Sequence, residues 1–300
     1  MKRTRGIQRS RDEVIFDAVN MTLLIIFSAC CLFPLINLFA KAVSSESAVV
    51  RGEVILWPVG FQLESVTFML QQHGFQRAFL NSVKVTVLGT LLNAAVTILA
   101  AYPLSRKQLK GRRILQFFVV FTMLFNGGLI PTFILIQRLG LLETHASIIL
   151  PSACNAYWII IVRNYFEGIP DALEESAKID GASNIKTFAA IMLPLALPCV
   201  ATLIVFAAVG LWNEYFTSLL YLHKRDNFTL QLYLRQLLES ASGTAGSMLV
   251  NASQMRAMKN KSPQIIQAAA VFLSTLPILV VYPFLQRYFV KGMTLGAVKG

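Results

Sequence analysis

Six long apolar stretches constrain the fold of this chain more than any other feature of its sequence. Each has roughly the 20 residues that an α-helix needs to cross the hydrocarbon core of a bilayer. Only 14% of the 300 residues are charged and the mean hydropathy is +0.60, so lipid is the solvent for much of the chain. The sequence therefore predicts an all-α polytopic membrane protein, one transmembrane domain over residues 1–300, with six transmembrane helices at about 17–40, 79–104, 113–137, 146–163, 199–222 and 265–288.

The basic residues predict which side of the membrane each connection faces. Five of them fall within the first eleven residues, and five more lie between Arg106 and Arg113. Because cytoplasmic loops carry an excess of Lys and Arg, both termini and the 164–198 connection are expected in the cytoplasm. The 41–78 and 223–264 connections are then external. The six basic residues of 223–264 weigh mildly against this orientation, but long loops count for less.

The 164–198 connection has the pattern of a short helix, a tight turn and a second helix. Pro170 suits the first turn of a helix, and Gly181 can adopt the positive φ that ends one. Ser183 can then cap a second helix, which Pro194 is expected to stop or kink. The connection therefore predicts a rigid helix pair on the cytoplasmic face.

This helix pair has the chemistry of a docking surface for a soluble partner. Glu174 and Lys178 stand four residues apart in the favourable order, and Leu173 and Ala177 are expected to form one small apolar stripe. The alternative is an amphipathic segment lying on the bilayer. That alternative fits poorly, because the first helix is acidic and the inner leaflet is usually anionic.

The same connection carries a spaced motif. Glu175-Ser176-Ala177 is followed after three residues by Gly181, and after nine more by Ile191 and Leu193-Pro194. This pattern resembles the EAA loop of binding-protein-dependent ABC importer permeases, with Ser176 where Ala is usual. Asn81-Ser82 and Trp212-Asn213-Glu214 also resemble this family, and the tail 286–300 is similar to that of the smaller, maltose-type sugar permease subunit. The stretch LFNGGLIPTF at 124–133 resembles the branch that serves oligosaccharide and polysaccharide uptake.

The resemblance implies the type I ABC importer permease fold and a division of labour. Two six-helix permease subunits form the translocation path in the bacterial inner membrane, and each docks one of two ATPase subunits through its EAA loop. An extracytoplasmic sugar-binding protein delivers a sugar or oligosaccharide. ATP and Mg are expected on the ATPase subunits, with no cofactor bound by this chain. The residues implied in ATPase coupling are Leu173, Glu174, Glu175, Ser176, Ala177, Lys178, Asp180, Gly181, Ile191, Leu193 and Pro194.

The chain shows no sign of chemistry of its own. It has no G-x-x-x-x-G-K-[ST] run for ATP and no H-E-x-x-H or G-x-S-x-G motif for hydrolysis. Its four cysteines lie in apolar segments without C-x-x-C pairing, so neither a metal site nor catalytic residues are predicted. The sequence therefore predicts a non-catalytic pore subunit.

Polar and aromatic residues at membrane depth are the candidates for a substrate path. Polar groups in lipid are expensive and usually face protein or water, and sugars are bound by aromatic faces beside hydrogen-bonding groups. The candidates are Asn126, Trp212, Asn213, Glu214 and Tyr215. For Glu214, a bond to the partner permease is an equal alternative, and most membrane aromatics are interfacial packing.

Two further features bear on the spans. Asn93 has the common structural alternative of bonding between helices, and Gly127, Gly128 and Pro131 would loosen the third helix. A competing function is an ion-coupled secondary transporter acting without an ATPase. That function needs paired charges or broken helices at the midplane, whereas Glu214 is the only strong candidate charge.

Overall fold

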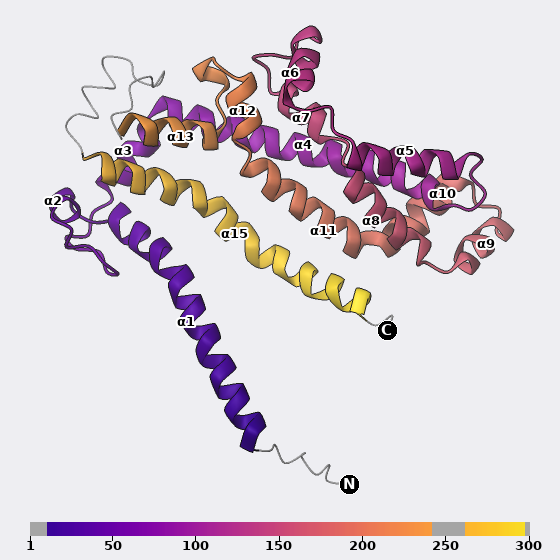
Figure 1. Cartoon of the computed structure of the whole chain (residues 1–300), viewed down its shortest axis with the longest axis horizontal. Helices are drawn as coiled ribbons and strands as arrows, with labels where there is room; N and C mark the ends of the chain where they lie inside the picture. Colours follow the sequence, from indigo (N-terminus) through magenta and orange to yellow (C-terminus); the bar gives the residue numbers. More distant parts are fainter. Residues whose placement is uncertain (1–10, 242–261, 298–300) are drawn as a thin grey trace. The chain divides into compact units, whose positions relative to one another are not determined.

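The computed structural model describes residues 11–241 and 262–297, and all regular structure in these residues is helical (Figure 1). Four helices are long and apolar enough to cross a membrane: Asp12–Ala42, His73–Ser105, Asn184–Trp212 and Pro263–Val281. Two bent helix pairs pass the same test together and bring the number to six. The all-α class and six candidate spans are therefore confirmed.

The third span is bent rather than straight. α5 (Arg112–Leu124) and α6 (Leu129–Arg138) meet at 111°. At the break, Gly128 has a φ of +86° and donates its N–H to Asn126 Oδ1 at 2.9 Å. The prediction of one continuous helix over 113–137 is therefore wrong, while the loosening expected from the glycines is confirmed.

The fourth span is also divided. α7 (Ala146–Ser152) and α8 (Ala156–Glu167) meet at 41°. Asn155 caps α8 by accepting the N–H groups of Tyr157 at 3.0 Å and Trp158 at 3.4 Å. A side chain that caps a helix favours a new start over continuation, which explains the break.

The fifth span begins earlier and ends earlier than the predicted 199–222. α10 (Asn184–Thr187) passes through a π-helical turn (Phe188–Met192) into α11 (Leu193–Trp212), and α12 (Phe216–Tyr221) follows a second break. The helix therefore does not stop at Pro194, where the sequence predicts a stop or kink. A proline lacks the N–H for the helical ladder, and the wider π-turn lies directly before it.

The remaining described elements are three long helices, α1, α4 and α15, and five short elements. They are α1 (Arg11–Ala42), α2 (Glu46–Val50), α3 (Glu64–Gln71), α4 (His73–Ser105), α9 (Asp171–Ile179), a 3-10 turn (Arg225–Asn227), α13 (Leu230–Ala241) and α15 (Pro263–Ala297).

The chain divides into two compact units, one formed by residues 1–69 and 251–273 and the other by 70–250 and 274–300. In the first unit, Asn37 of α1 donates to the carbonyls of Val54 at 3.1 Å and Ile55 at 2.7 Å. These bonds hold the segment after α2 against the last turns of α1. Whether the chain acts as a single transmembrane domain stays a prediction.

The second unit is built around α4, which packs against α8 and α11. One core joins the three helices at one end of α4, through Ala101, Val162, Phe166, Met192 and Leu203. Gly89 permits the close approach of α11, because a Cβ at this position would lie 2.7 Å from Leu211 Cδ1. α9 and α10 lie near this core's end of α4, while α12 and α13 lie toward the other end (Figure 1).

Candidate functional site

The turn after α9 has the geometry that the sequence predicts. Gly181 has a φ of +75° and donates its N–H to the Lys178 carbonyl at 3.0 Å. Ala182 closes the same turn by donating to the Ala177 carbonyl at 2.9 Å. Ser183 then caps α10, accepting the Lys186 N–H at 3.3 Å. The roles expected for Gly181 and Ser183 are confirmed, and together they fix the angle at which α9 leaves the following helix.

α9 presents one face to the protein and another to the surroundings. Its buried residues are Glu174 and Ala177, which are 9% and 5% exposed. Leu173 is 42% exposed and Ile179 is 86% exposed. The expected stripe of Leu173 and Ala177 is therefore wrong: Ala177 packs inward, and the outward apolar surface consists of Leu173 and Ile179, with Ile185 of α10 exposed beyond them.

The buried carboxylate of Glu174 is held by two cations. Arg106 donates through Nη1 to one oxygen, and Lys178 Nζ donates to the other at 2.9 Å. Burial raises the pKa of Glu174, but the hydrogen bonds from Lys178 and Arg106 outweigh it, so the net shift is below the usual carboxyl range. Glu174 is thus a charged group facing into the protein.

The other guanidinium nitrogens of Arg106 also donate hydrogen bonds within the second unit. Nη2 donates to the Phe166 carbonyl at 3.0 Å, and Nε donates to Ser105 Oγ at 2.9 Å. The guanidinium carbon also lies 5.1 Å from the centre of the Tyr102 ring, within cation–π range. One side chain therefore joins the end of α4, the end of α8 and α9.

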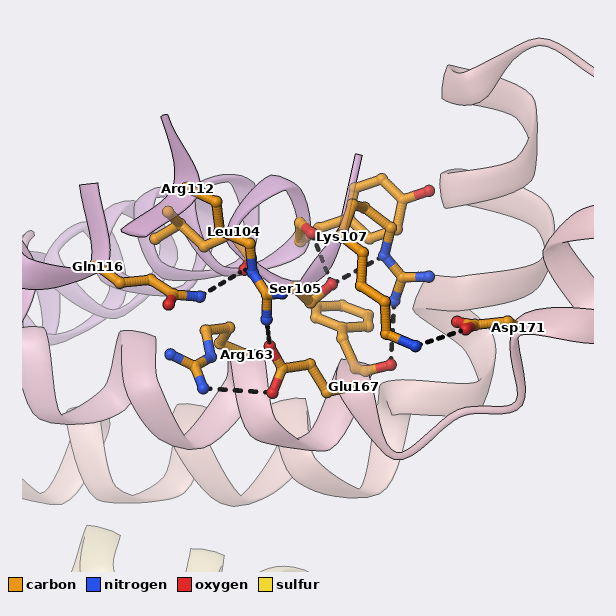
Figure 2. A network of polar contacts seen from close by, with 11 residues as sticks. Leu104, Ser105, Lys107, Arg112, Gln116, Arg163, Glu167 and Asp171 are labelled. Carbon is orange, nitrogen blue, oxygen red and sulfur yellow. Dashed lines mark hydrogen bonds and ion pairs between the residues drawn. The ribbon is translucent and has the colours of Figure 1, made fainter. Parts of the chain in front are cut away.

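A second carboxylate, Glu167 at the end of α8, is also held by two cations (Figure 2). Arg112 at the start of α5 pairs with one oxygen, and Arg163 Nη2 approaches the other at 3.2 Å. Arg112 Nε and Gln116 Nε2 both donate to the Leu104 carbonyl, at 2.9 Å and 3.0 Å. The network satisfies the Leu104 carbonyl in the last turn of α4, where a helix end otherwise leaves carbonyls without partners.

An exposed pair lies beside this network. Lys107 Nζ reaches Asp171 Oδ2 at 3.2 Å, and the two side chains are 81% and 63% exposed (Figure 2). Such pairs contribute about 0–1 kcal/mol, because water and salt screen them. This pair also joins the α4–α5 connection to α9, but in solvent.

Sequence reasoning missed most of the residues that form the two ion-pair networks around Glu174 and Glu167. From the sequence, Arg106 and Arg112 are only basic residues that predict the orientation of the chain, and Glu167 has no predicted role. The i,i+4 spacing of Arg163 and Glu167 was a readable signal. The pairing of Arg106 with Glu174 joins residues 68 positions apart and leaves no local pattern.

The other residues implied in coupling divide between surface and core. Glu175 and Ser176 are exposed on α9, and Asp180 is exposed directly after its last residue. Ile191 and Leu193 are partly buried against the core of α4, α8 and α11, and Pro194 is exposed.

The residues predicted to line a substrate path lie at two helix breaks. Trp212 is 7% exposed and packs edge-to-face on Phe79, with ring centroids 5.8 Å apart. Asn213 donates to the Val209 carbonyl at 2.9 Å, and Glu214 Oε1 accepts the Thr217 N–H at 2.8 Å. Each residue therefore ends or starts a helix.

The remaining two candidates, Tyr215 and Asn126, have local contacts as well. The Arg235 guanidinium carbon lies 5.2 Å from the Tyr215 ring centre, and Asn126 caps the break in the third span. The substrate role of all five residues stays a prediction. Asn93 donates to the Ser152 carbonyl at 2.7 Å, which confirms its bonding between helices.

Comparison with known proteins places the chain in a family. Residues 93–295 match the family described as binding-protein-dependent transport system inner membrane component. The polygalacturonan/rhamnogalacturonan transport system permease protein YtcP of Bacillus subtilis (strain 168) is 42% identical over 95% of this chain and 99% of its own length. Protein LplC of the same organism is 39% identical over 95% of each chain.

Solved structures agree with this placement. A chain from a bacterial ABC transporter involved in the import of the acidic polysaccharide alginate superposes with a TM-score of 0.87 at 35% identity. The match covers 95% of this chain and all of the other. A chain of a bacterial alginate ABC transporter, solved in complex with an alginate pentasaccharide-bound periplasmic protein, shares the fold at a TM-score of 0.60 and 18% identity. This chain therefore belongs to the binding-protein-dependent transport system inner membrane component family and is a permease subunit of an ABC importer.

Proposed function

We propose that the chain forms half of the path by which an ATP-driven importer takes up oligosaccharides released from acidic polysaccharides. The observation that carries the proposal is the full-length match to the permease of an alginate importer, at 35% identity and a TM-score of 0.87. The relative that transports polygalacturonan and rhamnogalacturonan points to the same substrate class, because galacturonan and alginate are both polymers of uronic acids.

The complete importer contains partners that this chain requires. A second six-helix permease completes the path, two ATPase subunits bind ATP and Mg, and an extracytoplasmic sugar-binding protein delivers the substrate. Both termini and α9 face the cytoplasm. The cluster of five basic residues between Arg106 and Arg113 supports this orientation, because it lies at the same end of α4 as α9.

α9 is the surface that docks on an ATPase subunit. Leu173 and Ile179 provide the apolar contact, and Glu175 offers an exposed carboxylate for charge-assisted bonds. Glu174 and Ala177 face inward and hold the helix in place. The docking face therefore contains fewer residues than the motif implies.

A photoreactive amino acid at position 179 tests the docking in the assembled importer. We expect it to crosslink to the ATPase subunit, because the Ile179 side chain is 86% exposed. The matched control is position 91, since Leu91 is 62% exposed on α4 within a candidate span. A crosslink from 91 but none from 179 would overturn the docking.

The substrate class has its own test. Reconstituted importer with its binding protein should take up oligogalacturonides, and uptake should require ATP hydrolysis. Uptake of neutral malto-oligosaccharides alone would contradict the acidic class. Uptake that continues without ATPase subunits would restore the ion-coupled transporter, which the family assignment does not support.

A further inference from the structure

We propose that Arg106 is a positioning residue that locks α9 to the end of α4, so that the second span moves together with the docking helix. This inference rests on the proposed docking of α9 on an ATPase subunit. It adds a second path by which a displacement of α9 reaches the membrane spans. The covalent route runs from α9 through Gly181 and α10 into α11, and the lock sends the same displacement directly into α4.

The position of Arg106 suits this role. It is the residue directly after α4, and its own N–H donates to the Pro103 carbonyl at 3.0 Å, which fixes its backbone to the last turn of the helix. Its guanidinium then reaches Glu174 on α9 and the Phe166 carbonyl on α8. A planar group with donors fixed in three directions holds its partners in one geometry, which a flexible ammonium group does not.

Burial makes this contact strong. The Arg106 and Glu174 side chains are 14% and 12% exposed, so little water competes for the pair. Charges that are removed from water interact more strongly and resist screening by salt. The neighbouring Lys107–Asp171 pair joins the same two segments but is 81% and 63% exposed. Lys107 therefore provides a control with the same connectivity and a weaker interaction.

α9 has little else to fix its orientation. Of its nine residues only Glu174 and Ala177 are buried, and Ala177 contributes a single methyl group. Lys178 holds the second oxygen of Glu174, but Lys178 belongs to α9 itself and so provides no connection to another element. Loss of Arg106 would leave α9 free to tilt about the turn at Gly181 without moving α4.

The test uses the complete importer, reconstituted in vesicles with its binding protein. In Arg106→Gln we expect the ATP hydrolysed per sugar imported to rise by about fivefold, because altered coupling elements typically change coupling by this order. Glu174→Gln removes the same ion pair with little change of shape, and it should give the same rise. Lys107→Gln should stay within about twofold of the wild type.

A double variant separates a lock from two independent effects. If Arg106 and Glu174 act as one unit, Arg106→Gln/Glu174→Gln should be no worse than the more impaired single variant. Hydrogen exchange measures the local stability of α9 separately from that of α4, which a general loss of folding would lower together. Amides of α9 should exchange faster in Arg106→Gln, while those of α4 away from its last turn keep their wild-type rates.

The outcomes distinguish the lock from the docking itself. If position 179 crosslinks to the ATPase and both single variants keep the wild-type ratio of ATP to sugar, the lock is wrong and the docking stands. If position 179 does not crosslink in the wild type, the docking fails first. Should Arg106→Gln not assemble, Glu174→Gln decides: an unchanged ratio overturns the lock, and a raised ratio supports it.

Discussion

Two turns of the second unit each combine a positive φ with an anchored carboxylate, but they do so with different residues. Each of these turns connects two helices. After α9 the two tasks are divided: Gly181 takes the left-handed conformation, and Glu174 makes the ion pair. In the turn between α6 and α7, Glu143 does both, with a φ of +61°, and Gly140 of the same turn also has a positive φ, +68°.

The carboxylates differ in what holds them. Glu174 is bound by two side-chain cations, Arg106 and Lys178. Glu143 accepts the backbone N–H groups of His223 and Lys224, each at 2.9 Å, and the His223 ring nitrogen Nδ1 lies 2.9 Å from the same carboxylate. Backbone donors remain whatever side chain is present. Glu143 should therefore keep its two backbone donors when His223 or Lys224 is substituted, whereas the Glu174 contact fails when either partner changes.

The largest effect is expected at Gly181. A Cβ there would meet no atom within 4 Å, so Gly181→Val costs only backbone strain, about 1–3 kcal/mol at a positive φ. The chain can escape this strain by changing the angle of α9. We expect assembly with the partner permease to survive and sugar uptake to fall by about tenfold or more, since 1.4 kcal/mol corresponds to a factor of ten.

Uptake and ATPase co-purification, measured on the same Gly181→Val preparation, decide this prediction. Gly181→Ala is the control for the loss of glycine without β-branching and should be milder. Full uptake with normal ATPase retention would show that the angle of α9 does not matter.

Substitution of Glu143 separates its two tasks. Glu143→Ala loses the carboxylate and keeps the strained φ, while Glu143→Gly loses the carboxylate and relieves the strain. We expect the Gly variant to be the more stable of the two by about 0.5–1 kcal/mol, since glycine adopts a positive φ without steric cost. Thermal unfolding of the detergent-solubilised protein measures the difference. Equal stability would mean that the conformation of residue 143 carries no strain.

Acid should weaken the Glu143 turn. Burial raises the pKa of this carboxyl, but the hydrogen bonds from Lys224 and His223 outweigh it, so the folded pKa lies below the usual 4.5. A carboxyl with a lowered pKa contributes its full stability above the unfolded value, and the contribution is lost as the pH falls through the folded value. The stability gap between the wild type and Glu143→Gln, about 1 kcal/mol for hydrogen bonds of this kind, should therefore close below pH 4.5.

Unfolding curves recorded from pH 6 to pH 3 test the acid effect. Glu174, whose pKa is also lowered, should behave in the same direction when compared with Glu174→Gln. A gap that stays constant over this range would show that the carboxylate charge contributes nothing to the turn.

The comparison also explains how far the sequence could predict the structure. Gly181 and Ser183 are local signals, because glycine readily adopts a positive φ and serine readily caps a helix. Both predictions are confirmed. The number of spans follows from apolar length alone. Glu143 carries no such signal, because a glutamate is an unusual residue at a positive φ.

The breaks in the spans were only partly predictable. The glycines at 127 and 128 indicate the bend of the third span. Asn155, in contrast, caps α8, and Glu214 accepts an N–H of the first turn of α12, in stretches that read as continuous apolar runs. Hydropathy averages over such residues, whereas the backbone responds to a single capping oxygen. The pairing of Arg106 with Glu174 depends on the packing of α4 against α8, which no local pattern records.

The unbroken course of the chain from Asn184 to Trp212 has a geometric consequence. These 29 residues form one rod through the π-helical turn, and at a rise of 1.5 Å per residue the rod is about 43 Å long. A tilt of about 10° at its Asn184 end would carry the Trp212 end sideways by about 7 Å, roughly the width of one sugar ring. A small rotation at one surface thus becomes a displacement of substrate size at the break that holds Asn213 and Glu214.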